Sequence, residues 1–484
     1  MDQKPIIEFA TAKDKPKYLR LADKNTPKWT DQYNHDHHGM KLPDVDLCVT
    51  GIVKYGPKAV QISYLNNKFE NTYVIVPNEF LASILPAEKF AEMEKKYALT
   101  QERTKLRNEL HFAGCCGSDP EMFVVDKDNK LIPAFTFLPS KDKALKAELS
   151  KNWYGGIPNN IYWDGFQAEF DTTPNSCFSG QADSIHFGLQ GLLKAARAFN
   201  KDAKLSHRTV VEIPPEMMAE GKPEHINFGC MPSFNAYGMK GLEMPGHEVP
   251  FRPAGGHIHL SFIGLKQDEA IKIVKAMDAI LGVATVSLFA KFDDSRRRTL
   301  YGLAGEYRLP KHGLEYRVLS NAWLMHPLLA HIVFDLGRTA AMVGKKGMLS
   351  RWQCEESETI RIINECDVDA ARKVLKTNEE FLKRILEVKY LNWWSSGDKL
   401  DPIKAAEYAY NAIMNGAESI IADPTDIEAN WNLLGAKSKV DSEKELKSSD
   451  YSNSNDDGTW RLHSDGAGKN VMFVFKHDLE NKKV

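Results

Sequence analysis

The chain has 484 residues, of which 43% are apolar and 26% charged, and its formal net charge is -2 at pH 7. This composition is that of a soluble globular protein, and the length predicts two or three structural units. The near-neutral charge excludes nucleic-acid binding driven by bulk charge. The seven scattered cysteines form no disulfide framework, which favours a reducing compartment. Without an apolar signal region or a bilayer-length apolar run, we expect a cytoplasmic protein with no membrane partner.

Residues 1–110 are predicted to form a small accessory β-rich unit. A lead rich in lysine and histidine over residues 28–41 is expected to be a loop. A charged helical stretch over residues 87–110 closes the unit, to which we assign no chemistry. Three β-like runs lie between these two segments, at residues 47–53, 59–64 and 72–76.

Residues 111–345 mix helical and strand-like patterns and carry the chemistry. Apolar positions at helical spacing predict helices over residues 183–200 and 268–292. A third helix is predicted from Pro327 to Val343, because proline suits a first helical position. The alternation with strands is too irregular for a doubly wound parallel sheet. We therefore expect an α+β domain with a largely antiparallel sheet.

Residues 346–484 are predicted to be a helical C-terminal region. Amphipathic patterns extend over residues 360–388 and 402–421. A polar segment over residues 447–458 is typical of a loop or of disorder, and a strand-like run follows at residues 471–475.

Three segments carry pairs of polar residues two positions apart, flanked by apolar residues typical of core-facing strands. In an extended strand, such pairs point to the same face. Charged groups remain in such a setting only when a metal, a ligand or one another satisfies them. The pairs are Asp119 with Glu121, His257 with His259, and Glu315 with Arg317. Carboxylates, imidazole and guanidinium on one sheet face predict a metal–nucleotide site.

Each motif has another explanation when it stands alone. The histidines suit a zinc pair or two structural histidines, and the last pair suits a same-face ion pair. The first pair suits a turn, because Pro120 removes a ladder donor. A further carboxylate, Glu169, lies in the apolar run over residues 164–170. Arginines come from residues 296–298 and from Arg308, and at least one of the three consecutive arginines is expected in a solvated turn.

The order of these motifs resembles the glutamine synthetase superfamily, which also includes glutamate–cysteine ligases and guanidino kinases. Segments 117–121 and 252–259 look most like the phage-encoded carboxylate–amine (COOH–NH2) ligases, or amidoligases. The resemblance covers about residues 112–340, and five short motifs in the right order make chance a poor explanation. Asp119 departs from the pattern, because synthetases typically carry glutamate there.

The resemblance implies a glutamine synthetase-like domain whose sheet carries the site and whose helices pack on the outer face. It implies that the metal ligands are Asp119, Glu121, Glu169, His257 and Glu315. It implies that nucleotide phosphate or substrate meets His259, Ser261, Arg308, Arg317 and one of Arg296 to Arg298, with Arg297 as the choice. Glu315, Arg308 and Arg317 are the expected catalytic residues. Carboxylates prefer Mg2+, and an imidazole in the set also accepts Mn2+.

The implied reaction is ATP-dependent amide formation. A carboxylate attacks the γ-phosphate of ATP to give an acyl phosphate and ADP, and an amine then displaces phosphate. Two alternatives stay open: a guanidino or other small-molecule kinase on the same fold, and a zinc-dependent hydrolase that uses the two histidines. The hydrolase explains neither the arginines nor Glu-x-Arg. Cys115 and Cys116 are expected to be small core residues rather than nucleophiles.

The expected partners are a small-molecule or peptide carboxylate and an amine, in the host cytoplasm for a phage protein. The sequence leaves open the identity of both substrates, the number of metal ions and the oligomeric state, a homo-oligomer included.

Overall fold

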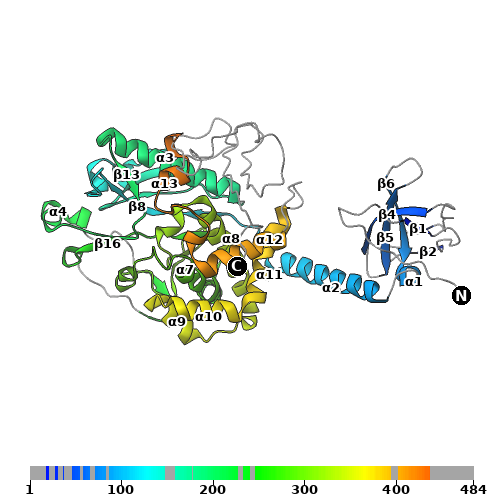
Figure 1. Cartoon of the computed structure of the whole chain (residues 1–484). Helices are drawn as coiled ribbons and strands as arrows, with labels where there is room; N and C mark the ends of the chain where they lie inside the picture. The colour runs from blue at the N-terminus through cyan, green and yellow to red at the C-terminus, as the bar shows by residue number, and fades with distance from the viewer. Residues whose placement is uncertain are drawn as a thin grey trace. The chain divides into compact units, whose positions relative to one another are not determined.

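The computed structural model of the chain divides into two compact units, residues 1–105 and 106–484 (Figure 1). The residues that the structure describes are 18–20, 28–30, 36–37, 46–54, 58–65, 71–82, 87–147, 159–176, 178–226, 233–239, 246–393 and 402–435. The predicted polar segment 447–458 and terminal strand 471–475 lie outside the described residues.

The first unit contains a four-stranded antiparallel sheet in the order β1-β4-β5-β6. Its strands are β1 (Tyr18–Arg20), β4 (Asp46–Lys54), β5 (Ala59–Leu65) and β6 (Asn71–Pro77). The last three confirm the three predicted β-like runs. The lead over residues 28–41, predicted as a loop, instead contains a short ladder of β2 (Trp29–Thr30) and β3 (Asp36–His37). Helix α1 (Asn78–Ala82) follows, and α2 (Ala87–Leu110) has the predicted bounds.

The second unit is built on two larger antiparallel sheets. The six-stranded sheet follows the order β10-β11-β12-β8-β13, with β9 paired to β8. Its strands are β8 (Glu121–Val125), β9 (Leu131–Ile132), β10 (Leu145–Lys146), β11 (Asn160–Asp164), β12 (Gln167–Phe170) and β13 (Lys204–Ser206). The register sets Glu121 opposite Glu169 on β12. Two carboxylates are therefore neighbours across adjacent strands.

The five-stranded sheet follows the order β15-β18-β19-β17-β7. Its strands are β7 (Cys116–Ser118), β15 (Phe234–Asn235), β17 (Ile258–Ser261), β18 (Glu306–Arg308) and β19 (Gly313–Tyr316). The central strand, β17, sets His259 opposite Glu315 on one side and Gly117 on the other. The residue opposite Glu315 on its far side is Arg308.

Asp119 and Pro120 carry the chain from the five-stranded sheet into the six-stranded sheet. We predicted that Asp119 and Glu121 share one strand, but β7 ends at Ser118 and β8 begins at Glu121. Proline has no amide proton for the ladder, which explains why the pairing changes at this point. Asp119 therefore lies just after the last residue of β7, and Glu121 is the first residue of β8, so the two acids do not share one strand face.

Helices cover one side of both sheets. Helix α3 (Phe178–Phe199) packs against β11, β12 and β13, and α8 (Pro327–Lys345) packs against β17 and α3. The helix predicted over residues 183–200 thus begins earlier, whereas the helix predicted from Pro327 ends within two residues of its expected end. The helix predicted over residues 268–292 is α6 (Gln267–Met277), a π-turn η4 (Asp278–Gly282) and α7 (Val283–Leu288).

The C-terminal helices pack onto this layer, α11 against α8 and both α10 and α12 against α7. The single pattern predicted over residues 360–388 is three helices, α9 (Glu356–Glu365), α10 (Val368–Thr377) and α11 (Glu379–Trp393). Cys366 adopts a left-handed backbone conformation and Asp367 caps α10 through the Ala370 amide, which separates the first two. Helix α12 (Pro402–Asn415) ends before Gly416, where φ is 91°, short of the predicted residue 421.

Short elements complete the second unit. A two-stranded ribbon pairs β14 (Val210–Glu212) with β16 (Phe251–Pro253). The remaining helices are α4 (Pro215–Glu220), α5 (Pro223–Ile226) and α13 (Ile427–Asn430). All strand pairs of the described residues are antiparallel, which confirms the mixed α+β class. Among these residues, no helix has the length and apolar character needed to cross a membrane.

Candidate active site

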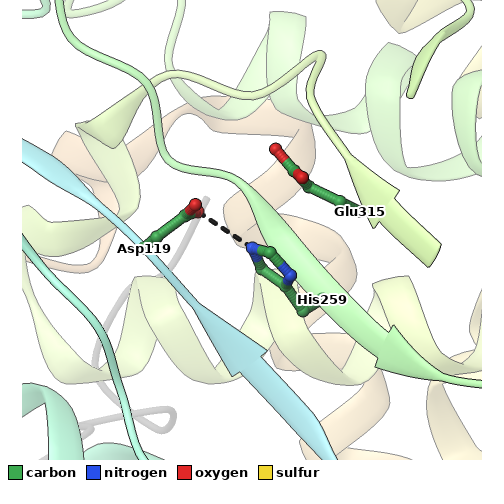
Figure 2. Close-up of side chains that lie close together, drawn as sticks. All are labelled: Asp119, His259 and Glu315. Atoms are coloured by element: carbon green, nitrogen blue, oxygen red, sulfur yellow. Dashed lines mark ion pairs between the residues drawn. The ribbon is translucent and has the colours of Figure 1, made fainter. Parts of the chain in front are cut away.

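Asp119, His259 and Glu315 meet where the two sheets join. One ligand atom from each side chain can be chosen so that all three lie within 4.8 Å of one another. The carboxylate of Asp119 lies 3.0 Å from Nε2 of His259, and Figure 2 shows it pointing from its own strand segment toward the strand that carries the imidazole. These three side chains, here called the ligand triad, offer two oxygens and one nitrogen to a cation.

His259 is held in place from behind by another histidine. Its Nδ1 lies 2.9 Å from Nε2 of His312, an exposed residue in the turn before β19. This contact leaves Nε2 of His259 directed at Asp119. Burial lowers the pKa of His259, but the charge of Asp119, the contact with its carboxylate and the charge of Glu315 together outweigh burial and raise the pKa above its ordinary value.

His257 is more deeply buried than His259 and also faces the acids. Its Nδ1 lies 3.4 Å from Asp119 and 3.7 Å from Glu315. Burial, followed by the charge of Arg317, lowers the pKa of His257, so the ring is neutral at pH 7. The resemblance implied a metal ligand at His257 and a phosphate contact at His259, whereas the geometry groups His259 with Asp119 and Glu315.

The two glycines before the histidine pair allow this close packing. A Cβ on Gly255 would lie 2.6 Å from Nε2 of His257. A Cβ on Gly256 would lie 2.3 Å from both the Ser320 carbonyl oxygen and Nε1 of Trp323. A side chain at either position would displace these neighbours. Because Gly255 has none, the imidazole of His257 can pack directly against the Gly255 backbone.

Glu121 is a buried carboxylate that holds two segments together. Its Oε2 accepts hydrogen bonds from the Gly255 amide at 2.7 Å and from the Tyr301 hydroxyl at 2.8 Å. Burial and the charge of Asp164 raise the pKa of Glu121 to about 7, and the two hydrogen bonds only partly oppose the rise. This carboxylate therefore carries much less charge at neutral pH than an exposed one.

Glu169 and its neighbours form an acidic wall on the six-stranded sheet. The Tyr162 hydroxyl donates to Glu169 at 2.6 Å and contacts Asp171 at 2.7 Å. Burial and the charge of Asp119 raise the pKa of Glu169 well above its ordinary value. Burial also raises the pKa of Asp164. Negative charge is unfavourable here without further cations.

Lys141 reaches this wall of acidic side chains. It lies in η2 (Lys141–Lys143), and its Nζ is 3.6 Å from Oε1 of Glu169 and 4.5 Å from the centre of the Tyr162 ring. Burial lowers the pKa of Lys141, but the nearby carboxylates, Glu169 first, raise it above its ordinary value. The side chain is nevertheless 67% exposed, so the ammonium approaches the acids from solvent.

Glu315 lies between two arginines of the same sheet. Nη1 of Arg317 is 2.5 Å from Oε1 of Glu315, and Nη1 of Arg308 is 3.5 Å from the same oxygen. Arg317 is buried, whereas the side chain of Arg308 is 25% exposed. Arg308 is therefore the more accessible of the two arginines to an anion in the site.

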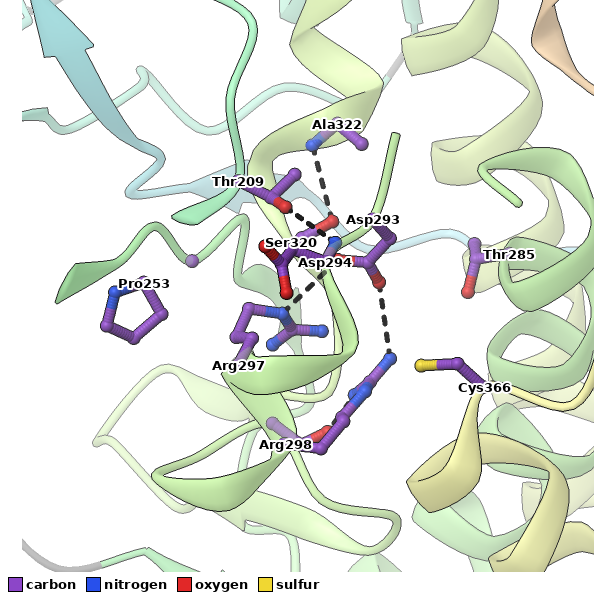
Figure 3. A network of polar contacts seen from close by, with 12 residues as sticks. Thr209, Pro253, Thr285, Asp293, Asp294, Arg297, Arg298, Ser320, Ala322 and Cys366 are labelled. Atoms are coloured by element: carbon purple, nitrogen blue, oxygen red, sulfur yellow. Dashed lines mark hydrogen bonds and ion pairs between the residues drawn. The ribbon is translucent and has the colours of Figure 1, made fainter. Parts of the chain in front are cut away.

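The three consecutive arginines serve the interior and the surface. Arg297 and Arg298 are both buried and donate to the Val318 carbonyl oxygen, at 2.6 Å each. Figure 3 shows Arg298 linked to Asp293, which also pairs with Arg297. Arg296 pairs on the surface with Glu212 and Asp294. The structure thus does not bring Arg297 into the ligand triad's surroundings, because its guanidinium is occupied in the core.

Ser261, expected near nucleotide, accepts a hydrogen bond from the Cys115 amide at 2.8 Å. Its hydroxyl therefore joins β17 to the residue that precedes β7. Cys116 is fully buried, and its Sγ lies 2.8 Å from Nε of Arg338. The first contact holds β17 to the start of β7, and the second holds β7 to helix α8.

Sequence reasoning assigned no role to several residues of the site. Tyr162 and Asp164 have the same i, i+2 spacing as the motifs that were singled out, and that signal could have found them. Lys141, Tyr301 and His312 lie in a 3-10 helix, a loop and a turn, where no periodicity points to a face. Their positions depend on tertiary structure.

The donor set fits a divalent cation such as Mg2+ or Mn2+. Carboxylate oxygens with one imidazole suit these ions. Burial first, and neighbouring carboxylates after it, raise the pKa values of Glu121, Asp164 and Glu169, so negative charge on these groups is unfavourable as they stand. Burial of such charge is favourable only with a counter-ion. The ligand triad would hold the ion.

A separate pocket of about 760 Å³ lies beside the β14 ribbon strand. Its lining includes Lys130, Arg208, Asp294 and Arg296, and contains no residue of the ligand triad or the acidic wall. This pocket has a volume suited to a small molecule, but it is separate from the ligand triad and from the acidic wall.

Comparisons with known proteins add one match to a protein family. Residues 210–433, just under half of the chain, match the family model described as "Phage phiEco32-like COOH.NH2 ligase-type 2". This range contains both histidines and the β18–β19 arginines, but not Asp119, Glu121 or Glu169. A comparison with the curated proteins found no match.

Among solved structures, a bifunctional glutathione synthetase from Pasteurella multocida is similar at 10% identity with a TM-score of 0.32. The alignment covers 64% of this chain and 52% of that chain, so this chain spans about half the length of that synthetase. A TM-score of this size assigns neither fold family nor function. The family match supports a carboxylate–amine ligase.

Proposed function

We propose that this protein is an ATP-dependent ligase that joins a carboxylate to an amine through an acyl-phosphate intermediate, on a glutamine synthetase-like catalytic domain. The observation that carries the proposal is the ligand triad of Asp119, His259 and Glu315, with Arg308 beside Glu315. A cation site next to an accessible arginine suits phosphoryl transfer, which needs positioning and charge neutralisation more than covalent chemistry. The family match over residues 210–433 supports the same reaction class.

The divalent ion would be held by the ligand triad, and Glu121 and Glu169 would supply further carboxylates near it. When bound, it would neutralise phosphate oxygens of the nucleotide. Side chains of the protein position the strands that carry these ligands. Glu121 holds the Gly255 amide, and thereby the start of the histidine strand, against β8.

Arg308 would bind an oxygen of the transferred phosphoryl group. Its side chain is partly exposed and 3.5 Å from Glu315, so it can contact a ligand while its position is fixed. The planar, forked guanidinium matches phosphate geometry. Arg317 would mainly hold the Glu315 carboxylate in position, since Arg317 is buried and its Nη1 lies only 2.5 Å from Oε1 of Glu315.

The reaction follows from the poor reactivity of a free carboxylate. Attack of the carboxylate oxygen on the γ-phosphorus of ATP breaks the bond to ADP and forms the acyl phosphate. The amine then attacks the acyl carbon, phosphate leaves, and the amine loses a proton to give the amide. No side-chain nucleophile takes part.

The proposal is tested by phosphate release from ATP in the presence of Mg2+ and a panel of amino acids, peptides and amines. We expect free phosphate to require both a carboxylate and an amine, and mass spectrometry to find a product lighter by one water than the two substrates together. Arg296→Lys is the control for arginine variants of the site, because Arg296 is a surface arginine that pairs with Asp294 and Glu212. We expect it to release phosphate as wild type does.

A kinase on the same fold gives a different result. It would release ADP without free phosphate and leave a phosphorylated acceptor. ADP formation that needs no amine, with a phosphorylated product, would therefore replace the ligase proposal by the kinase.

A further inference from the structure

We infer that the ammonium of Lys141 is a built-in cation of the active site, taking the place that a second divalent ion would occupy beside Glu169. The inference deepens the proposed function and rests on it for the ion at the ligand triad. It makes the site a pairing of one exchangeable divalent ion with one positive charge supplied by the chain itself. Lys141 is then a positioning residue for the acidic wall.

The position of Lys141 is built by several contacts. Its Nζ lies 3.6 Å from Oε1 of Glu169 and 4.5 Å from the centre of the Tyr162 ring. Tyr162 in turn donates its hydroxyl to the same Glu169 oxygen at 2.6 Å. An aromatic face and a carboxylate together form a good site for an ammonium.

The backbone around Lys141 is anchored to the acidic strand. Helix η2, which carries Lys141, packs against β11. The amide of Trp163 on β11 donates to the Pro139 carbonyl oxygen at 3.1 Å. The lysine therefore starts from a point fixed to the strand that carries Tyr162 and Asp164, and its side chain needs only to extend across that strand.

The arrangement of charge explains why a lysine is useful at this point. Glu121 and Glu169 are opposite each other in the register of β8 and β12, and Asp119 is close to both sheets. One divalent ion at the ligand triad lies on the histidine side and leaves Glu169 to be neutralised. Lys141 meets Glu169 from solvent, and its ammonium supplies there the positive charge that a second ion supplies in two-metal enzymes.

Removal of the ammonium should therefore open a second cation position. In Lys141→Gln, Glu169 and Asp171 lose their neighbouring positive charge but keep their oxygens and the Tyr162 hydroxyl. Hard divalent cations bind such oxygen sets. We expect the wild-type chain to bind one Mn2+ and Lys141→Gln to bind two.

The experiment counts bound Mn2+ on the full chain by electron paramagnetic resonance of the free ion, without nucleotide. The matched control is Lys143→Gln, at the other end of the same exposed 3-10 helix. Lys141→Arg tests whether any fixed cation suffices, and the double variant Lys141→Gln/Glu169→Gln tests where the second ion binds. We expect one Mn2+ for Lys143→Gln, for Lys141→Arg and for the double variant.

The result that overturns the inference is a single bound ion in Lys141→Gln, as in wild type, or two ions already in the wild-type chain. If wild type and Lys141→Gln each bind one ion while amine-dependent phosphate release persists in wild type, only the role of Lys141 fails. If no variant binds Mn2+, the divalent site of the proposed function fails together with it. Thermal melting checks that each variant is folded.

Discussion

His259 stands directly opposite Glu315 in the register of β17 and β19. Two potential cation ligands are thus neighbours across one antiparallel ladder, and Asp119 completes the group from the end of the adjacent strand β7. Backbone hydrogen bonds fix the spacing of His259 and Glu315, whereas Asp119 is placed by the crossing of the chain between β7 and β8.

Glu315→Gln should nearly abolish ATP turnover while the fold is retained. Glutamine has almost the same volume but removes one negative ligand from the ligand triad. We expect the Mg2+ concentration for half-maximal activity to rise by about 100-fold or more, because changes to groups that merely support metal ligands already cost about 10–100-fold. Steady-state kinetics across a Mg2+ titration measure it. Activity within a few-fold of wild type would remove Glu315 from the ligand set.

His259→Ala and His257→Ala should fail in different ways. His259 belongs to the ligand triad, so its loss should raise the Mn2+ concentration required by about 10–100-fold. His257 is buried against the Gly255 backbone, so its loss should lower the melting temperature and change the metal requirement less. Mn2+ titrations with thermal melts of both variants separate the two effects. The reverse pattern would make His257 the ligand, as the family resemblance implied.

Arg308→Lys should damage catalysis more than metal binding. Lysine keeps the charge but loses the forked donors that match phosphate, so we expect kcat to fall by about 10–100-fold at saturating Mg2+. Arg317→Lys is the comparison, because it replaces a buried arginine that holds Glu315. We expect that variant to raise the metal requirement instead. Equal kcat for Arg308→Lys and wild type would exclude Arg308 as a phosphate ligand.

The buried carboxyl group of Asp278 should make stability depend on pH. Burial raises its pKa from 3.8 to about 7, and the Tyr316 hydroxyl only partly opposes this by donating at 2.6 Å. Between pH 4 and 7 the folded protein keeps a proton that the unfolded chain loses. This contribution to stability is therefore full below about pH 4 and is lost as the pH rises through about 7, at about 1.4 kcal/mol per pKa unit.

Asp278→Asn should flatten that dependence. Urea unfolding of wild type and variant from pH 4.5 to 8 measures it, with the exposed Asp128→Asn as the control. The free energy of unfolding of wild type should fall more steeply with pH than that of Asp278→Asn. Parallel curves would show that Asp278 is ionised in the folded state throughout this range.

Local sequence patterns predicted most of the helices and strands, but not the breaks within helical patterns or the change from one sheet to the other. The β-like runs of the first unit and the helix from Pro327 emerge because apolar periodicity reports which face is buried. The same rule missed the break at Cys366, because a left-handed residue within an amphipathic pattern leaves the periodicity nearly intact. It also gave no sign that Asp119 and Glu121 belong to different sheets, since the change depends on what each strand pairs with.

The candidate site divides in the same way. The i, i+2 spacing was sufficient to bring both histidines toward one carboxylate, because strand geometry alone sets their direction. It could not rank them, since the ranking depends on His312 and on the approach of Gly255 to His257. The buried position of Arg297 could not be predicted either. A charged residue in a sequence gives no sign that its partner is a buried carbonyl oxygen, here that of Val318.

The passage of the chain through Asp119 and Pro120 has a mechanical consequence. The backbone connects the two sheets at this point, and Glu121 connects them a second time. The Glu121 amide donates to the Gly255 carbonyl oxygen, and the Glu121 carboxylate accepts from the Gly255 amide. The ion that we propose at Asp119 and His259 would add a third link at the same place. Ion binding and the junction of the two sheets would then be thermodynamically coupled: a change that weakens the junction would lower the affinity for the ion, and the bound ion would stabilise the junction by the same free energy.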